Sequence, residues 1–513
     1  MSGPADRPSR PLLVVALLGA LLVGGCTTVV AGEAAKAPAT AAASVPSTVS
    51  TTDDTVAVAP TSPTTSTTPA TTPDQDRPQS ASPTTKPLTT APTSVSPYDL
   101  QVRHDAAFEK LLASLAAGLR SGDRKKFLAP FAPSLNSRVG HWFSNTRALG
   151  VAAVKFAPSQ DYSSGATDSV SSLTRTLVLG VRTPYDDDDS MPGIVYSVGA
   201  RITTRAGVDT LTITSWQPKY LGDPMNCDCT LKVVNHNNIA VVADAADGDL
   251  VYWSDSALQA ADRGISWSSA QLAGTGLVVP KGQVIFLADK PFHWFLSLDG
   301  TGQQSNVTAG LVDADGDYPG TRYSDQSRIV LMLQSADGSV VPNDREGRQY
   351  ATDVITHEST HQLMNRNSSL PSRNENSPPT WVAEGIAVAV ETLYRDSLGD
   401  SADVDYPEPN DPKNTSSSWY TEHLTDGMPT KAQLYSSSST DGSGYYAIAG
   451  SVFRYLERED GYLTMMQIAA LMYLKPAQTP FDFFPDPDHP GQRLPAATAK
   501  SRWKAWFVDN YEN

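Results

Sequence analysis

The feature that most constrains this chain is a pair of histidines, four positions apart, in a stretch with little charge. The segment reads His357-Glu-Ser-Thr-His361, and between Val354 and Arg366 the only charged residue is Glu358. On an α-helix, positions four apart lie on one face, so both imidazoles can reach one cation. Glu358, adjacent to the first histidine, can then approach a water on that cation. The pattern predicts a buried helix that holds a metal ion.

A third ligand is expected from the apolar segment that follows. Pro378-Pro-Thr380 breaks the chain, and Trp381–Val390 then reads as a second helix in which Glu384 is the only charged residue. A lone carboxylate in such a stretch is costly to bury unless it binds a cation or a strong donor. A metzincin pattern is excluded, because it would need glycine and histidine where this chain has Met364 and Asn367. Glu384 is therefore the expected third ligand.

Two imidazoles and one carboxylate favour zinc over calcium or magnesium, and we expect one Zn²⁺ per chain. Three protein ligands leave a fourth position open, as a catalytic zinc requires. Such a position has room for a water molecule, which the Glu358 carboxylate is placed to approach.

The motif followed about twenty residues later by Trp-x-x-Glu-Gly-x-Ala resembles the gluzincin superfamily of zinc metallopeptidases, in particular its peptidase-MA-like branch. The resemblance extends from Leu231 to Trp506. It implies hydrolysis of peptide bonds in a peptide or protein substrate. It also implies three metal ligands and one catalytic base, namely His357, His361, Glu384 and Glu358.

The family also uses a tyrosine or histidine downstream of the third ligand to stabilise the oxyanion. The stretch from Gly444 to Leu456 resembles the helix that carries this residue, and Tyr446 matches its opening tyrosine best. Tyr445 and His423 remain alternatives. Such a donor is needed because an oxyanion develops during acyl transfer.

Substrate contacts are less visible in the sequence. Ile329–Leu333 is a candidate edge strand for an extended peptide, with a buried strand as the alternative. The long polar segment Asp396–Thr440 could be a lid or a surface insertion. Two other functions stay open: an inactive metal-containing lipoprotein that binds a partner or cell-wall component, and hydrolysis of a non-peptide amide in the cell wall.

The N-terminus predicts export and lipid attachment. Arg7 and Arg10 precede the short apolar run Pro11–Val23, which suits a signal peptide over residues 1–25. Small residues then lead to Cys26, as in a bacterial lipobox, which makes Cys26 the expected lipid anchor; an ordinary signal peptide is the alternative. We expect an extracellular protein on the outer face of the bacterial cytoplasmic membrane, with no membrane contact besides the anchor.

Residues 26–97 are dominated by Thr, Pro, Ser and Ala and predict a disordered tether. The formal net charge of -16 argues against a nucleic-acid partner. The sequence does not indicate an oligomeric state.

The remaining chain predicts an α+β protein in two parts. Residues 98–225, with two helical stretches before long alternating strands, are similar in element order to an NTF2-like module. Residues 230–513 form the gluzincin-type domain, mostly helical towards its C-terminus. Asp186–Asp189 is expected to be a solvated loop. Cys227 and Cys229 are a possible disulfide, with free thiols as the alternative.

Overall fold

The computed structural model describes residues 96–158, 167–169, 171–188, 191, 193–218, 223–289, 309–312, 328–333, 340–367, 378–398, 417–424, 427–434, 439–475 and 477–511. The predicted signal peptide, Cys26 and nearly all of the tether lie outside these residues. Most of Asp396–Thr440, the candidate lid, does so too. Among the helices that the structure describes, none is long and apolar enough to cross a membrane.

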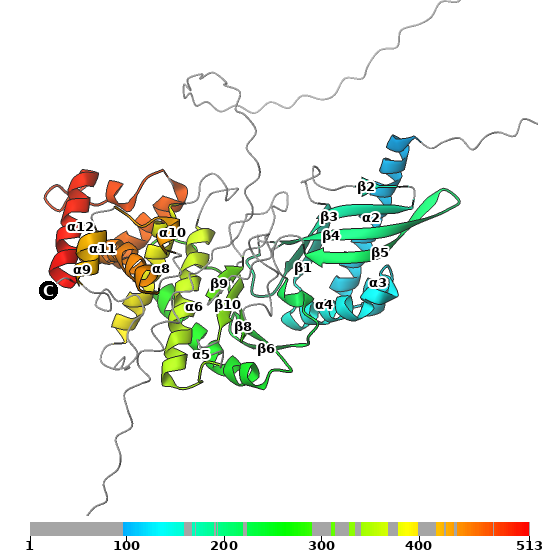
Figure 1. Cartoon of the computed structure of the whole chain (residues 1–513), viewed down its shortest axis with the longest axis horizontal. Coiled ribbons are helices and arrows are strands. Elements are labelled where there is room, and N and C mark those ends of the chain that lie inside the picture. The colour runs from blue at the N-terminus through cyan, green and yellow to red at the C-terminus, as the bar shows by residue number, and fades with distance from the viewer. Residues whose placement is uncertain are drawn as a thin grey trace, which may run out of the picture. The chain divides into compact units, whose positions relative to one another are not determined.

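The N-terminal part consists of three helices and an antiparallel sheet (Figure 1). The helices are α2 (Pro97–Ser121), α3 (Arg124–Leu128) and α4 (Asn136–Leu149). The strands are β1 (Ala153–Pro158), β2 (Thr167–Asp168), β3 (Ser172–Arg182), β4 (Gly193–Arg205) and β5 (Val208–Pro218), in the order β1-β3-β4-β5, with β2 paired to β3. The sequence predicted the three long strands and two of the helices. It missed α4, whose apolar residues are interrupted by polar ones.

Aromatic side chains fill the core between these helices and the sheet. Phe127 stacks on Trp142 with ring centroids 5.6 Å apart, and Trp216 meets Trp142 edge-on at 6.2 Å. The buried Asp223 carboxylate accepts hydrogen bonds from Trp142 Nε1 and the Tyr196 hydroxyl, both at 2.7 Å. Burial raises the pKa of Asp223, although these donors partly oppose the shift. These contacts hold the helices against the sheet.

A second sheet begins the C-terminal part. It contains β6 (Leu231–His236), β7 (Ile239–Asp244), β8 (Gln283–Ala288), β10 (Arg328–Met332) and β9 (Ala309–Val312), in that spatial order. The pairs β7–β8 and β8–β10 are parallel, and α5 (Gly248–Gln271) connects β7 to β8. Every residue of β7 and β8 is buried, as expected for parallel strands covered on both faces.

The order of strands decides between the two alternatives for Ile329–Leu333 in favour of a buried strand. The candidate edge strand Ile329–Leu333 forms most of β10, which lies between β8 and β9 and is therefore internal. The edge strand beside it is β9, which pairs antiparallel with β10. The sequence did not reveal β9 because Ala309-Gly-Leu-Val312 is too short to show alternation.

Among the residues that the structure describes, the rest of the chain is mostly helical, which confirms the predicted α+β class with a mostly helical C-terminal part (Figure 1). Its helices are α6 (Arg345–Arg366), α8 (Thr380–Ser397), α9 (Ser417–His423), α10 (Lys431–Leu434), α11 (Ser439–Leu474) and α12 (Ala496–Tyr511). At Gly461, φ is 83°, and α11 is kinked there. Trp503 and Phe507 of α12 are fully buried in the core that α8 and α11 also form.

The acidic loop between β3 and β4 is not solvated as predicted. Asp186 is completely buried, and its carboxylate oxygens accept from the two terminal nitrogens of Arg328 at 2.5 and 2.9 Å. The backbone amide of Thr183 also donates to it at 2.6 Å. Only Asp188 is exposed, while the fourth aspartate lies outside the described residues. The prediction was wrong because the cation that pairs with Asp186 is distant in sequence.

Asp187, the next residue, extends the same contact to the second sheet and to α6. Its carboxylate lies 3.2 Å from Nε of Arg366, the last residue of α6, and accepts from the Lys281 amide at 2.8 Å. Through Asp186 and Asp187, one loop thus holds the start of β10 and the end of α6. We call these contacts the Asp186–Asp187 anchor.

A disulfide joins Cys227 and Cys229. Asn145 of α4 lies beside it, donating to the Cys229 carbonyl at 3.1 Å and accepting from the Leu231 amide at 3.1 Å. The bridge therefore lies where the N-terminal part is joined to β6.

Candidate metal centre

The site is built on α6. Its N-terminus is capped by Asp344, whose side chain accepts from the Gly347 amide at 2.9 Å. The second half of the helix is buried on nearly all sides, because α5 and α8 both pack against it. Burial on this scale explains why the segment around His357 carries so little charge.

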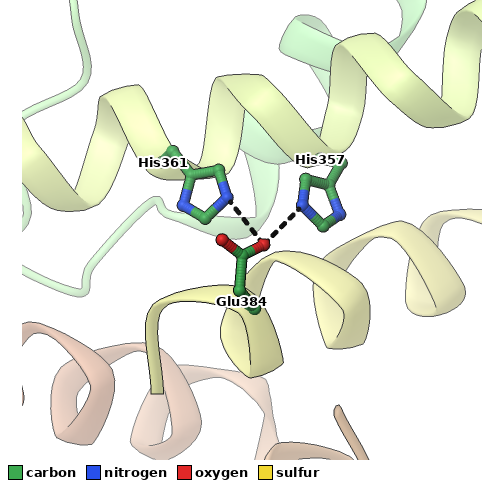
Figure 2. Close-up of side chains that lie close together, drawn as sticks. All are labelled: His357, His361 and Glu384. Carbon is green, nitrogen blue, oxygen red and sulfur yellow. Dashed lines mark hydrogen bonds and ion pairs between the residues drawn. The ribbon is translucent and has the colours of Figure 1, made fainter. Parts of the chain in front are cut away.

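Three predicted ligands meet between α6 and α8 (Figure 2). Oε2 of Glu384 lies 3.3 Å from Nε2 of His357 and 3.4 Å from Nε2 of His361. All three side chains are buried, and one ligand atom from each lies within 4.8 Å of the others. The cluster could hold one metal ion, and its two imidazoles and one carboxylate suit zinc.

The charges of the cluster are consistent with a cation site. Burial by itself raises the pKa of Glu384, but His361 and His357 outweigh this effect and lower the pKa to about 2. The carboxylate is therefore ionised at neutral pH, as a ligand must be.

The surroundings of the Glu358 carboxylate indicate whether this site suits a metal ion with a reactive water molecule. Both of its carboxylate oxygens are buried and, among the residues that the structure describes, neither has a hydrogen-bond partner. A buried, unpaired carboxylate is costly, so a protein retains one only where something else meets it. A water molecule on a metal held by His357 and His361 would supply that partner. His357, His361 and Glu358 therefore fit a metal ion that carries a water molecule.

Glu391 is a further residue of the candidate site and was not predicted from the sequence. Its Oε2 lies 3.2 Å from Nδ1 of His357, on the opposite side of the imidazole from Glu384. It follows Glu384 by seven positions, which is two helical turns, so both carboxylates lie on one face of α8. That spacing in an apolar helix was a signal that could have identified it.

The contacts continue beyond Glu391. Asp353, one turn before His357, forms an ion pair with Arg395 and accepts from Gln349 at 2.7 Å. Burial and the nearby Glu391 raise the pKa of Asp353 to about 7, partly offset by Arg395. The first ligand is thus supported by a chain of buried polar groups shared between α6 and α8.

Glu391→Gln should weaken zinc binding by about 10- to 100-fold, because a carboxylate on the far nitrogen orients a histidine ligand and makes it more basic. Titration against a competing chelator measures the change. Asp396→Asn, which removes an exposed carboxylate of the same helix, is the matched control and should leave the affinity unaltered. Equal affinities for the Glu391→Gln variant and the parent chain would contradict this role.

Gly385, next to Glu384, allows α8 and α11 to approach closely. A Cβ atom at this position would lie 2.6 Å from the carbonyl oxygen of Ala449. Gly450 is similarly close, since its Cβ would lie 2.6 Å from Cγ1 of Val388. The position of Glu384 is therefore fixed by backbone packing between two helices.

Gly385→Ala should lower the free energy of unfolding by about 1–3 kcal/mol, because the added methyl group forces α8 away from α11. Urea denaturation measures this change, and zinc affinity should fall with it as Glu384 moves. Gly248→Ala is the control: nothing lies within 4 Å of its new Cβ, so stability should be unchanged or slightly higher. Unaltered stability of the Gly385→Ala variant would show that the helices can separate without cost.

The candidate oxyanion donors lie in two different settings. The Tyr446 ring is buried beside the site, with its centroid 6.4 Å from that of His357. Tyr445 and His423 instead pack on Trp419, at centroid distances of 5.0 and 4.0 Å. The structure therefore brings Tyr446 to the metal ligands and places the two alternatives in an aromatic cluster.

No family model matches this chain, and no curated protein matches it in sequence. Among solved structures it is distantly similar to an M1 zinc metallopeptidase from Deinococcus radiodurans, with 12% identity and a TM-score of 0.26 over 69% of this chain and 73% of the other. A point mutant of that enzyme gives 12% and 0.24 over 60% and 58%, so this chain spans less than two thirds of that structure. The mutant bound to a Tyr-Ser-Ala substrate gives 12% and 0.24, over 70% of each chain.

Proposed function

We propose that this chain is a zinc-dependent metallopeptidase that hydrolyses peptide bonds. The observation that carries the proposal is the buried cluster of His357, His361 and Glu384, with the unpaired carboxylate of Glu358 beside it. Three ligands of these types leave a position for water and substrate, and the adjacent carboxylate supplies a base. We infer the metal and the base from this chain's own residues.

When bound, zinc would lower the pKa of a water molecule towards about 7 and polarise the scissile carbonyl. Glu358 would take up the proton of a water molecule held there, since its oxygens have no competing partner among the described residues. It then donates the proton to the nitrogen of the leaving amine. The hydroxyl of Tyr446, whose ring lies beside His357, is the proposed donor to the developing oxyanion.

Glu391 fixes the orientation of the first ligand in this scheme. With a metal in the site, its carboxylate would accept the proton on Nδ1 of His357, which leaves the lone pair of Nε2 for the metal. Glu391 would in this way hold His357 in the tautomer that a metal ligand needs.

The proposal also includes the location of the enzyme. Residues 1–26, with the lipobox-like cysteine Cys26, support attachment to the outer face of the bacterial cytoplasmic membrane. A substrate at the cell surface follows from that location.

The test is to purify the full chain, measure its zinc content and incubate it with a mixed peptide library. We expect about one zinc per chain, cleavage that stops with a chelator, and recovery when zinc but not calcium is returned. Cleavage that survives complete removal of the metal would refute the mechanism. Bound zinc without cleavage of any peptide would refute the substrate class and direct attention to non-peptide amides.

A further inference from the structure

A cavity of about 390 Å³ lies against α6 on the side away from the metal ligands. Ser359 and Leu363 line it, and these positions are half a turn away from His357 and His361 around the helix. Its other walls come from the turn between β6 and β7, from α5, from the start of β8 and the residues before it, and from Val390 of α8 and Tyr462 of α11. Its volume is within the range of about 300–1,000 Å³ that is usual for small-molecule sites.

The polar wall of this cavity is organised by Gln283, which is only 3% exposed. Its Nε2 donates to Ser359 Oγ at 2.6 Å and to Gln362 Oε1 at 2.8 Å. Ser359 Oγ uses its own proton on the Ile355 carbonyl, so it can only accept from Gln283. The orientation of the Gln283 amide is therefore fixed by its partners.

In this orientation, neither Ser359 nor Gln362 donates a hydrogen bond to the carbonyl oxygen of the Gln283 amide. Oε1 of Gln283 is buried and has no hydrogen-bond partner among the residues that the structure describes. A buried acceptor without a donor is costly, and such groups are rare in native proteins. The atom therefore indicates a ligand that brings an N–H or O–H group.

Two hydroxyl groups of residues that line the same cavity are also buried without a described hydrogen-bond partner. Ser268 Oγ on α5 and the Tyr462 hydroxyl on α11 are both buried and, within the described part of the chain, make no hydrogen bond. Burial raises the pKa of Tyr462, so its hydroxyl remains protonated and can donate. The cavity thus offers one fixed acceptor and two hydroxyls from three different elements.

The charged groups at the cavity are already paired. Asp262 accepts from Asn237 Nδ2 at 3.0 Å, and Lys281 Nζ lies 3.2 Å from Asp188. The remaining lining combines neutral hydroxyl and amide groups with aliphatic side chains such as Leu272. This lining favours a neutral ligand with several hydroxyl groups over an ionised one.

We propose that this cavity is a second binding site, separate from the metal centre, that takes a neutral carbohydrate of one or two sugar units. Hydroxyl groups of the sugar donate to Gln283 Oε1 and exchange hydrogen bonds with Ser268 and Tyr462. The aliphatic wall covers the less polar face of the ring. The site does not depend on the proposed peptidase activity, because these three residues are not members of the metal cluster of His357, His361 and Glu384.

The test is to titrate the full chain with glucose, mannose, N-acetylglucosamine and maltose by ligand-observed NMR and calorimetry, with glucuronate as the charged comparison. At least one neutral sugar should bind and glucuronate should not. Ser268→Ala and Tyr462→Phe should each weaken that binding by about threefold to tenfold, the usual value of one hydrogen bond. Ser254→Ala is the matched control, because its hydroxyl is also buried on α5 but bonds to the Leu250 carbonyl outside the cavity.

Measurements of the melting temperature distinguish a loss of sugar binding from a loss of stability in the two variants. Ser268→Ala and Tyr462→Phe should not lower the melting temperature, since the removed hydroxyls have no described partner. Failure of every neutral sugar to bind, or binding unaffected by both variants, would overturn the proposal. A clear loss of stability in both variants without sugar binding would do so as well, by showing that the hydroxyls serve the fold. Loss of zinc or peptidase activity has no bearing on these readouts.

Discussion

Glu358→Gln is expected to reduce kcat/KM for peptide hydrolysis by about 10²- to 10⁴-fold while zinc content stays at one ion per chain. The amide keeps the shape of the side chain but cannot accept a proton from water. Metal binding should persist because Glu358 is not among the clustered ligands, His357, His361 and Glu384. Hydrolysis of a peptide identified in the library, measured beside metal analysis, tests both halves of the expectation.

Glu346→Gln provides the control for this variant, because Glu346 is an exposed carboxylate in the first turn of the same helix. It should retain full activity. Full activity in the Glu358→Gln variant would remove the general base from the mechanism. Loss of zinc in that variant would mean that Glu358 helps to hold the metal, so that the roles of the carboxylates would need to be reassigned.

Asp186→Ala should have the largest effect on stability, lowering the free energy of unfolding by about 3–5 kcal/mol. The variant leaves the Arg328 guanidinium, whose side chain is only 14% exposed, without the carboxylate that it contacts in the native protein. It also removes the acceptor of the Thr183 amide. Denaturation in urea followed by fluorescence measures the loss.

Two further variants identify the cause. Asp396→Ala breaks an ion pair with Arg454 in which the carboxylate is 55% exposed, and it should cost no more than about 1 kcal/mol. Adding Arg328→Ala to the Asp186→Ala variant should recover part of the loss, because no buried charge then remains unpaired. If Asp186→Ala proves as mild as Asp396→Ala, the Asp186–Asp187 anchor does not contribute to stability.

The candidate metal ligands could be predicted because each leaves a local trace in the sequence. The spacing of His357 and His361 is a property of one helix, and Glu384 is conspicuous as a lone charge in an apolar segment. The structure brings all three together. The long strands of the N-terminal part could be predicted too, since alternation over eleven to thirteen residues in β3, β4 and β5 is a strong signal.

What could not be predicted depends on partners far apart in the chain. Asp186 and Asp187 look like a solvated run until Arg328 and Arg366 are brought to them by the fold. The sequence left an edge strand and a buried strand open for Ile329–Leu333, because nothing in its own residues reports that β9 pairs beside it. The contact of Glu391 with His357 also joins two helices, although the spacing of Glu391 from Glu384 was a local signal that could have identified the residue.

The strand order of the second sheet has a consequence for the speed of folding. The first sheet is a meander of neighbouring antiparallel strands, whereas β7, β8 and β10 pair in parallel across long connections. Pairing of distant segments is slow, because the entropy of closing a long loop is lost before any contact forms. We expect the N-terminal sheet to acquire protected amides first in pulsed hydrogen exchange, and α6 to be completed only after its neighbouring strands have assembled. Its ligands would then be the last part of the molecule to become competent for metal.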